Sequence, residues 1–296
     1  MFDRFLNNRK SVPYLMLAPF LVLFLLFKVW PILYSIVLSV HDMSGLNRGA
    51  FIGLANYGKL LQDPDFYKAL INNTKYMIGT MITLIPIPLI IAVLLHSQLV
   101  KGRAVFRAIV FIPSLTSLVI AGAIFQILMH EGQGGVLNSV LQAVGLPPQK
   151  WLGSASLAMI SVLIVATWRW TGINMVYFSS GLAGIQEEVY ESASIDGANG
   201  FQKFIYITLP LLKPVLIFVA TLNVIGGYKL FTEVYTLWRG GISPDKGGLT
   251  LAIYLYRNAF SYFRLGYAST IGLVMAIIIL VLSVLQLKLT GFFNED

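Results

Sequence analysis

The sequence contains no cysteine and very little charge. Only 11% of its 296 residues are Asp, Glu, Lys or Arg, whereas soluble domains usually hold about a quarter. The missing cysteines exclude a disulfide framework, a thiol nucleophile and a cysteine-ligated metal. The low charge, together with 57% hydrophobic residues, places the chain among membrane proteins.

Motifs of common enzymes are also absent. The chain has no G-x-x-x-x-G-K-[ST] phosphate loop and no H-E-x-x-H zinc motif. No paired carboxylates and no Ser/His arrangement share one membrane depth, which argues against a membrane enzyme. His41, His96 and His130 are isolated near the ends of apolar runs, so no metal site is expected. We therefore expect no catalysis and no cofactor bound by this chain.

Six apolar runs are long enough to cross a bilayer, which needs roughly 20 residues. They are 13–40, 76–96, 106–130, 157–178, 211–228 and 267–289. Because backbone groups must be satisfied inside lipid, each run is predicted to be a helix. The first run is too long for a signal peptide and is expected to be a retained span. The predicted fold is an all-α membrane protein with six transmembrane helices.

The net charge of +8 is best explained by basic residues at the ends of spans. These residues form no basic face with interleaved aromatics, so we expect membrane lipid, and no nucleic acid, as a partner. The two clearest basic clusters precede the first run and separate the second from the third: Arg4, Arg9, Lys10, Lys101, Arg103 and Arg107. They predict that both termini are cytoplasmic. The expected organisation is a tail at 1–12, a six-span domain at 13–290 and a tail at 291–296.

Several predicted spans contain proline, namely at Pro31, Pro86, Pro88 and Pro113. Prolines are common in membrane helices, and this is the interpretation that we favour. The alternative is local unwinding of the kind that transporters use near binding sites.

The segment 179–210, predicted to be cytoplasmic, is unusually polar for this chain. Acidic residues at Glu187, Glu188 and Glu191 suit the beginning of a helix. Gly197 and Gly200 then allow a bend before a second apolar stretch. The pattern predicts helix, bend and helix. Such a pair could lie flat on the membrane or insert into a groove on a partner protein.

This segment resembles the EAA loop in the permease subunits of ABC importers. The family pattern is E-A-A, three residues, G, nine residues and then I-x-L-P. It is matched by Glu191, Ala193, Gly197, Ile207, Leu209 and Pro210, and only Ser192 departs from it. The longer form E-S-A-S-I-D-G-A, which includes Asp196, is similar to the sugar-uptake branch. Weaker matches are an APFL-like first span, Gly53, Leu54, Asn56, Tyr57, Phe111 and Pro113.

The resemblance implies the type I ABC importer permease fold of the maltose-type systems. In that family the loop 187–210 forms a coupling helix that docks on a cytosolic ATPase. Glu191 would be the polar contact with the ATPase and Gly197 the bend. ATP and Mg would bind the partner ATPase dimer, whose closure would switch the spans between inward-open and outward-open states. A second homologous permease subunit and an extracellular or periplasmic solute-binding protein are also implied.

The spans on either side of the loop contain the candidate substrate path. Arg169 is flanked by Trp168 and Trp170, a mixture that suits a sugar site, although an aromatic belt and a snorkelling arginine are equally open. Resemblance to the maltose-type permease implies a substrate path formed by Arg169, Trp170, Ile173, Asn223, Gly227 and Leu230. We add the neighbouring Tyr228 to this predicted path. Arg169 and Lys229 also leave an anionic substrate open.

The function predicted from the sequence is the permease subunit of an ATP-driven importer of a sugar or oligosaccharide in the bacterial plasma membrane. Within the same fold, the alternatives are importers of glycerol phosphate, an amino acid or another anionic solute. From another class, the alternative is an ion-coupled secondary transporter. That alternative predicts carboxylates at the span centres, and the sequence places Glu233 near a span end.

Overall fold

The computed structural model describes residues 12–43, 45, 49–97, 100–132 and 135–291. Within these ranges the regular structure is helical, apart from an isolated bridge between His41 and Phe51. The predicted all-α class is therefore confirmed. The tails expected at 1–12 and 291–296 lie almost wholly outside the described residues, as do Arg4, Arg9 and Lys10.

The chain divides into two compact units. The first contains Met1–Asp63 and Leu255–Val274, and the second contains Pro64–Tyr254 and Met275–Asp296. The described helices of the first unit are α2 (Val12–Phe24), the π-helix η1 (Leu25–Val29), α3 (Trp30–Ser39), α4 (Ala55–Leu61), the π-helix η4 (Arg257–Ser261) and the first turns of α17 (Leu265–Leu289).

Polar side chains join the elements of the first unit. The buried Ser39 hydroxyl lies 2.9 Å from the Tyr57 hydroxyl, and Asn56 Nδ2 donates to Ser39 O at 2.9 Å. Thr270 Oγ1 donates to the same carbonyl oxygen at 3.3 Å. Asn56 and Tyr57 belong to the Gly-Leu-x-Asn-Tyr segment, so this segment holds the end of α3 against α4 and α17.

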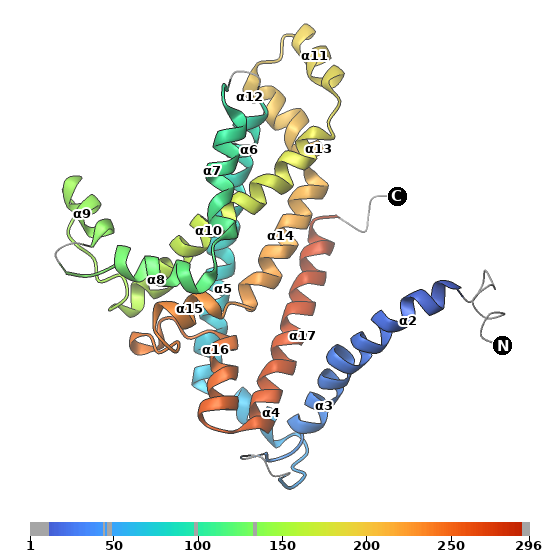
Figure 1. Cartoon of the computed structure of the whole chain (residues 1–296), viewed down its shortest axis with the longest axis vertical. Coiled ribbons are helices and arrows are strands. Elements are labelled where there is room, and N and C mark those ends of the chain that lie inside the picture. The colour runs from blue at the N-terminus through green and yellow to red at the C-terminus, as the bar shows by residue number, and fades with distance from the viewer. Residues whose placement is uncertain (1–11, 44, 46–48, 98–99, 133–134, 292–296) are drawn as a thin grey trace. The chain divides into compact units, whose positions relative to one another are not determined.

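The second unit is built around α10, which contacts α5, α6, α7 and α14 (Figure 1). Its longer helices are α5 (Pro64–Leu84), α6 (Pro86–His96), α7 (Arg103–Leu115), α8 (Leu118–Leu128), α10 (Ala155–Ala183) and α14 (Lys213–Tyr228). Its shorter helices are α9 (Val136–Ala143), α11 (Glu187–Ile195), α12 (Gly200–Lys203), η2 (Phe204–Thr208), α13 (Leu209–Leu211), α15 (Thr232–Leu237), η3 (Pro244–Lys246) and α16 (Leu251–Tyr256).

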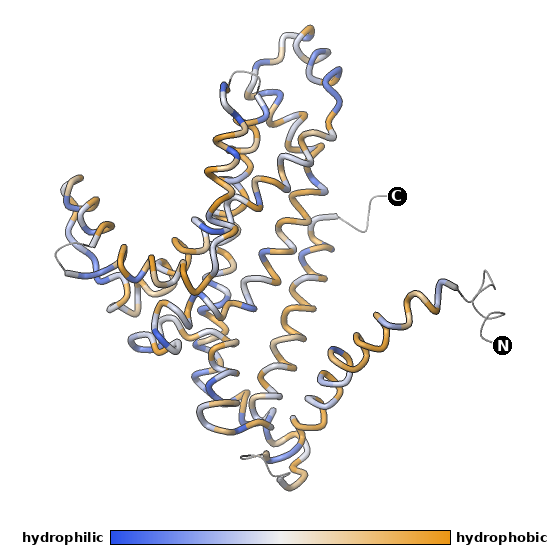
Figure 2. The backbone as a smooth tube through the Cα atoms, viewed as in Figure 1, coloured by the Kyte–Doolittle hydropathy of each residue, from blue (hydrophilic) through white to orange (hydrophobic). Residues whose placement is uncertain are grey.

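Up to six helical stretches of the described chain are long and apolar enough to cross a membrane. Four are Pro13–Ser39, Pro64–His96, Ala155–Ala183 and Leu265–Leu289. Two more are bent pairs, Arg103–Leu115 with Leu118–Leu128 and Gly200–Leu211 with Lys213–Tyr228. Figure 2 shows the apolar residues following these helices, while α11 and its surroundings are more polar. Counting each bent pair as one span gives the predicted number.

The predicted third span is not one straight helix, because α7 and α8 meet at a 99° bend. Pro113 lies in the last turn of α7 and has no N–H for the helix ladder. Thr116 and Ser117 are then extended before α8 begins. Local interruption, the less favoured interpretation of the prolines, therefore applies at Pro113. Pro31 and Pro86 instead lie in the first turns of α3 and α6.

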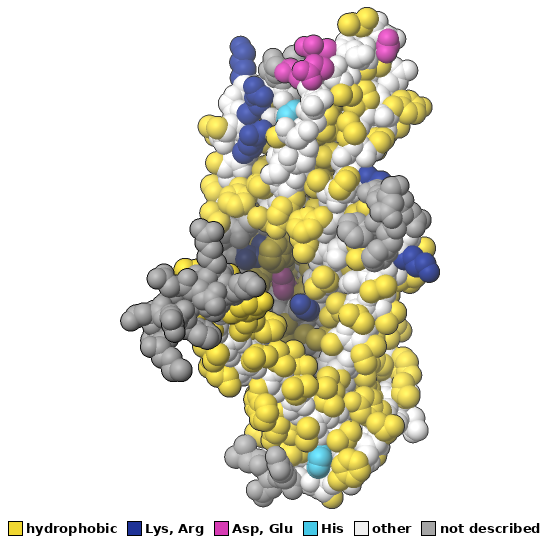
Figure 3. All heavy atoms as spheres, turned by 90° about the vertical axis from the view of Figure 1, so that its right-hand side faces the viewer, with side chains coloured by type: hydrophobic (Ala, Val, Ile, Leu, Met, Phe, Trp, Pro, Cys, Tyr) yellow, Lys and Arg dark blue, Asp and Glu magenta, His cyan; other side chains and the backbone are white. Residues whose placement is uncertain are grey.

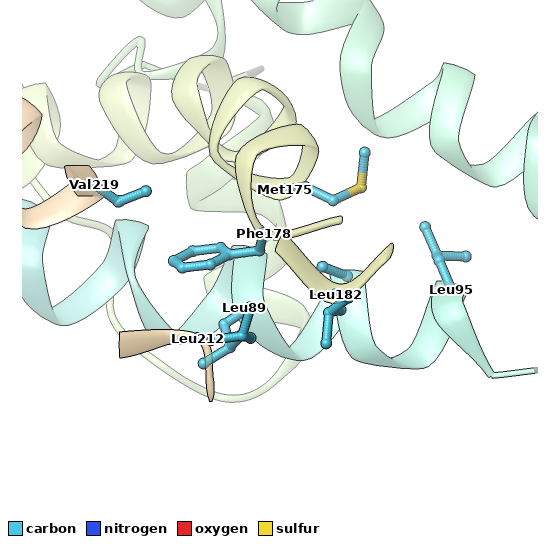
Figure 4. Close-up of a cluster of buried hydrophobic side chains, with 8 residues drawn as sticks. Leu89, Leu95, Met175, Phe178, Leu182, Leu212 and Val219 are labelled. Atoms are coloured by element: carbon cyan, nitrogen blue, oxygen red, sulfur yellow. The ribbon is translucent and has the colours of Figure 1, made fainter. Parts of the chain in front are cut away.

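An apolar cluster packs α10 against α6 and the beginning of α14 (Figure 4). Its buried members are Leu89, Ala92, Leu95, Met175, Phe178, Leu182, Leu212 and Val219. Lipid chains are as apolar as these side chains, so close packing, and not escape from water, stabilises the contact. The cluster joins the two helices that lead into and out of the polar segment.

Small residues allow α10 and α7 to approach each other closely. A Cβ at Gly172 would lie 2.8 Å from Phe111 Cα and closer still to the Val110 carbonyl oxygen. Ser114 Oγ donates to Arg169 O at 2.8 Å in the same region. The helices therefore meet backbone to backbone, as is common in membrane proteins.

We expect Gly172→Ala to destabilise the protein, because the added methyl group meets backbone atoms that have little room to move. Overpacking of this kind costs about 1–3 kcal/mol. Gly226→Ala is the matched control, since the methyl group added there would meet no other helix within 4 Å. Thermal unfolding of the purified protein in detergent should show a lower midpoint for Gly172→Ala than for Gly226→Ala. Equal midpoints would contradict the close approach.

Candidate functional site

The polar segment has the helix, bend and helix that its sequence predicts. Helix α11 ends at Ile195, and Gly197 follows with a φ of +82°. The Gly197 N–H donates to Ser194 O at 3.1 Å, and the Ala198 N–H donates to Ala193 O at 2.9 Å. These two bonds form a Schellman motif, in which glycine suits the left-handed residue. The bend is thus a defined structure and not a loose loop.

The second arm of the segment begins with a capping box. Asn199 Oδ1 accepts from the Gln202 N–H at 2.9 Å, and Gln202 Oε1 accepts from the Asn199 N–H at 2.8 Å. Side chains also link the two arms: the Tyr190 and Thr208 hydroxyls lie 2.9 Å apart, and Lys203 Nζ donates to Ser194 Oγ. The two arms are therefore held as one unit.

Helix α11 has no buried residue in this chain. Ile195 at its end is 87% exposed, and Phe201 beyond the bend is also exposed. Figure 3 shows acidic and basic side chains gathered at this end of the second unit. An exposed helix with apolar side chains and acidic neighbours is a surface suited to a protein partner.

The structure places the predicted coupling residues along this segment. Glu191, Asp196 and Gly197 are exposed and Ala193 is half-buried on α11 and its bend. Ile207 and Leu209 are half-buried and Pro210 is exposed, where η2 runs into α13. A 68° bend then leads into α14. Their role in coupling stays a prediction.

A cavity of about 430 Å³ lies within the second unit. Its lining comes from α5, α8, α10, α14, the turn that follows α14, and the first residues of α15: Tyr76, Thr80, Leu84, Leu118, Trp170, Ile173, Asn174, Tyr177, Leu222, Asn223, Gly226, Gly227, Lys229, Leu230, Phe231, Thr232 and Glu233. Aromatic rings and a few polar groups make up much of this wall, which is the usual mixture in a site for a small organic ligand.

Asn73 of α5 holds one end of the cavity wall. Its Nδ2 donates to Gly227 O at 2.6 Å, and its Oδ1 accepts from the Leu251 N–H at 2.8 Å. Asn72 similarly donates to Leu249 O at 2.9 Å. These buried amides satisfy backbone groups where α14 ends and α16 begins. They therefore set the path of the chain that carries Lys229 to Glu233.

A group of charged and aromatic side chains lies in and beside the cavity. The Arg169 guanidinium lies over the Trp170 ring, 5.0 Å from its centroid. Arg169 Nε and Nη1 are buried and find no hydrogen-bond partner among the described residues. Glu233, which also lines the cavity, is only 6% exposed. The positive charge of Arg169 favours the charged form of Glu233, which lies on α15.

Glu233 lies on α15, outside the candidate spans. Burial raises the pKa of its carboxyl above the ordinary value. Its own backbone N–H, the Trp170 side chain and the Arg169 charge each oppose part of that rise in pKa. These three groups therefore favour the charged form of a carboxylate that has lost most of its water.

The residues of the predicted substrate path separate into two sets. Those that line the cavity are Trp170, Ile173, Asn223, Gly227 and Leu230. Arg169 and Tyr228 lie outside the lining, and the Tyr228 hydroxyl lies 2.9 Å from Thr74 Oγ1. Contact of any of them with a substrate stays a prediction.

Sequence reasoning does not assign Tyr76, Tyr177 or Glu233 to this site. Tyr76 and Tyr177 give no signal, because tyrosines at helical spacing usually pack in a core. Glu233 has a usable signal: it is an acid four residues after Lys229, in a stretch that is otherwise apolar or uncharged. The sequence analysis used only its position near a span end, which does not by itself assign Glu233 to a site.

The described residues contain no group of three or more His, Asp or Glu side chains that could hold a metal ion.

Comparisons with known proteins agree with this architecture. Residues 84–290 match the family described as binding-protein-dependent transport system inner membrane component. The chain is 44% identical to the arabinooligosaccharides transport system permease protein AraP of Bacillus subtilis (strain 168), over 98% of this chain and 91% of that one. It is 34% identical to the lactose transport system permease protein LacF of Rhizobium radiobacter, over 92% of each chain.

Among solved structures, a chain of a bacterial alginate ABC transporter in complex with an alginate pentasaccharide-bound periplasmic protein has the same fold. The TM-score is 0.83 at 21% identity, over 97% of this chain and 96% of that chain. The chain therefore belongs to the family of binding-protein-dependent transport system inner membrane components. It is a multi-pass membrane permease of the kind found in sugar ABC transporters, and its relatives are transport components and not enzymes.

We expect Asn73→Leu to destabilise the protein, because Gly227 O and the Leu251 N–H lose their partner. A buried polar group left unsatisfied costs about 1–3 kcal/mol. Ile71→Leu is the control, since Ile71 is exposed on the same helix. Urea or thermal unfolding in detergent should separate the two variants. Equal stability would mean that Asn73 does not hold the cavity wall.

Proposed function

We propose that this chain is the permease subunit of an ATP-driven, binding-protein-dependent importer of oligosaccharides. The single observation that supports this best is the continuity between the cavity and the exposed helix α11. Helix α10 carries Trp170 to Tyr177 in the cavity wall and leads directly into α11. Helix α14 carries Asn223 and Gly227 and follows directly from the second arm.

In this proposal α11 docks on a cytosolic ATPase subunit, and ATP with Mg binds there. Closure of an ATPase dimer moves the Schellman bend, and α10 and α14 transmit the motion to the cavity. The buried cluster between these helices makes them move together. The cavity is then open to opposite sides of the membrane in turn, which is rigid-body switching.

The proposed assembly contains a second homologous permease subunit, two ATPase subunits and an extracellular or periplasmic solute-binding protein. It lies in the bacterial plasma membrane, with both termini of this chain in the cytoplasm.

AraP and LacF are named for arabino-oligosaccharides and lactose. We therefore propose a sugar substrate, of which an arabino-oligosaccharide is the first to test.

The proposed assembly is tested by purifying this chain from its native membrane and identifying the subunits that co-purify with it. Recovery of the chain without an ATPase would contradict the proposed assembly.

The bend at Gly197 is expected to be needed for coupling. Valine at a φ of +82° is strained by roughly 1–2 kcal/mol, and about 1.4 kcal/mol corresponds to a tenfold change in a population. Gly197→Val should therefore reduce sugar uptake about tenfold, while the subunit still reaches the membrane. Gly200→Val is the control, because Gly200 has no positive φ and no close neighbour. Unchanged uptake in Gly197→Val would refute the coupling role.

The exposed Ile195 is expected to contact the ATPase. A charge placed at an apolar hot spot costs about 2 kcal/mol or more of binding free energy, so Ile195→Asp should remove most of the co-purifying ATPase. Val144→Asp is a control of the same kind, since Val144 is 67% exposed near the end of α9. The ratio of ATPase to permease after affinity purification measures the effect. An undiminished ratio for Ile195→Asp would place the ATPase contact elsewhere.

A further inference from the structure

We propose that a second cavity, which lies between α7 and α10, binds one anionic phospholipid of the surrounding membrane. This cavity has a volume of about 470 Å³, and its lining comes from the end of α6, from α7 and from the last turns of α10. It shares no residue with the lining of the first cavity. The proposal therefore goes beyond sugar transport and does not depend on which substrate the permease carries.

Polar and apolar residues of the second cavity lie at different depths along the spans. Helices α7 and α10 touch where Gly172 approaches the backbone of Phe111. From this contact, α7 leads back to its short connection with α6, and α10 leads on to the polar segment. In these directions Arg107 lies one turn beyond Phe111, and Ser179 lies one turn beyond Met175. The cavity is thus apolar at its deep end and polar at its shallow end, toward the ends of the spans.

The deep end suits the first carbons of acyl chains. Its walls include the side chains of Phe111, Met175 and Val176. Ala108 and Val176 are themselves exposed, so the cavity opens on the surface of the helix pair. On the same face of the chain's apolar surface, an exposed aromatic ring follows from Phe106 of α7. Exposed apolar surface of this kind marks a site of contact with lipid or with another subunit.

The shallow end carries positive charge. Arg107 lies in the lining, Arg103 lies one turn earlier on α7, and Lys101 lies in the turn before that helix. In the described part of the chain, none of these three residues forms an ion pair with an acid. Arg103 Nη1 instead donates to His96 O at 3.4 Å, at the end of α6. Unmatched basic residues at the end of a span attract anionic lipid head groups.

Arg107 and Ser179 offer hydrogen bonds to a phosphate. A guanidinium has five N–H groups, and one on Nη2 of Arg107 donates to Leu95 O at 3.3 Å. The remaining groups can donate two parallel hydrogen bonds to a phosphate. Ser179 Oγ is buried and has no hydrogen-bond partner among the described residues. A phosphate oxygen in the cavity would supply the acceptor that this hydroxyl does not find in the chain.

An anionic phospholipid matches both ends of the cavity, and two simpler ligands do not. A zwitterionic lipid would bring a quaternary ammonium next to Arg107, and like charges repel each other. Free phosphate would leave the apolar walls at Phe111 and Met175 in contact with water, which is unfavourable. The combination of unmatched positive charge and apolar walls therefore favours a lipid with a net negative head group.

The test is native mass spectrometry of the protein, purified in detergent with the subunits that accompany it. The probes are dioleoyl phosphatidylglycerol, which is anionic, and dioleoyl phosphatidylcholine, which has the same acyl chains and no net charge. The wild type is expected to bind one phosphatidylglycerol at least about fivefold more tightly than phosphatidylcholine. Arg107→Gln should reduce this ratio to about twofold or less. Lys150→Gln removes an exposed basic residue outside the cavity and should leave the ratio unchanged.

A second variant tests the cavity without a change of charge. Ala108→Trp places a large ring in the lining and should weaken phosphatidylglycerol binding about tenfold, because the space for the lipid is lost. Ala104→Trp is the matched control, since Ala104 is exposed one turn earlier on α7 and lies outside the lining. This pair also covers the case in which Arg107→Gln fails to fold because Leu95 O has lost its partner.

Equal affinity of the wild type for the two lipids would overturn the inference. An unchanged ratio in folded Arg107→Gln, or unchanged phosphatidylglycerol binding in Ala108→Trp, would do the same. Displacement of the lipid by millimolar inorganic phosphate would indicate a site for free phosphate, and binding to the isolated chain but not to its complex with a second permease subunit would indicate a subunit contact. Either result would also overturn the inference, and none of these outcomes bears on the proposed import of sugars.

Discussion

Where helices stop inside an apolar bundle, their backbone ends need hydrogen-bond partners, and Asn73 supplies two of them. One amide joins the last turn of α14 to the first residue of α16. Between these points the chain leaves the path of α14, so that Lys229 to Glu233 enter the cavity wall. Without such an amide, the turn would expose backbone groups that lipid cannot satisfy. The cavity thus depends on a polar side chain buried in α5, a helix whose sequence shows no sign of this role.

The second constraint is mechanical continuity. The cluster around Phe178 and Leu212 holds α10 and the beginning of α14 together, just where the chain leaves and re-enters the bundle. The segment between them is tied internally by the Schellman bend, the capping box and the contact between Tyr190 and Thr208. A force on α11 would therefore be passed to both helices that line the cavity. In the proposed function, the polar insert would act as a lever through which another subunit moves α10 and α14.

Electrostatics give the cavity its character. Removing a charge from water is expensive, and a buried charge is normally matched by another. Arg169, which lies over the Trp170 ring, and Glu233, which lines the same cavity as Trp170, are distant in the sequence. From the sequence, Arg169 and Lys229 leave an anionic substrate open, because the sequence does not show which charged side chains lie near these two residues.

The sequence by itself determined the helical membrane class, the approximate spans, and the bend at Gly197, because hydrophobic runs and glycine in a fixed motif are local signals. It also placed Trp170, Ile173, Asn223, Gly227 and Leu230, which the structure gathers around one cavity. The tertiary structure alone decided that α7 and α8 meet at a 99° bend, that Arg169 lies outside the lining, and that Tyr76, Tyr177 and Glu233 belong to it. These outcomes depend on which helices are neighbours, and packing between distant segments, not local pattern, sets that.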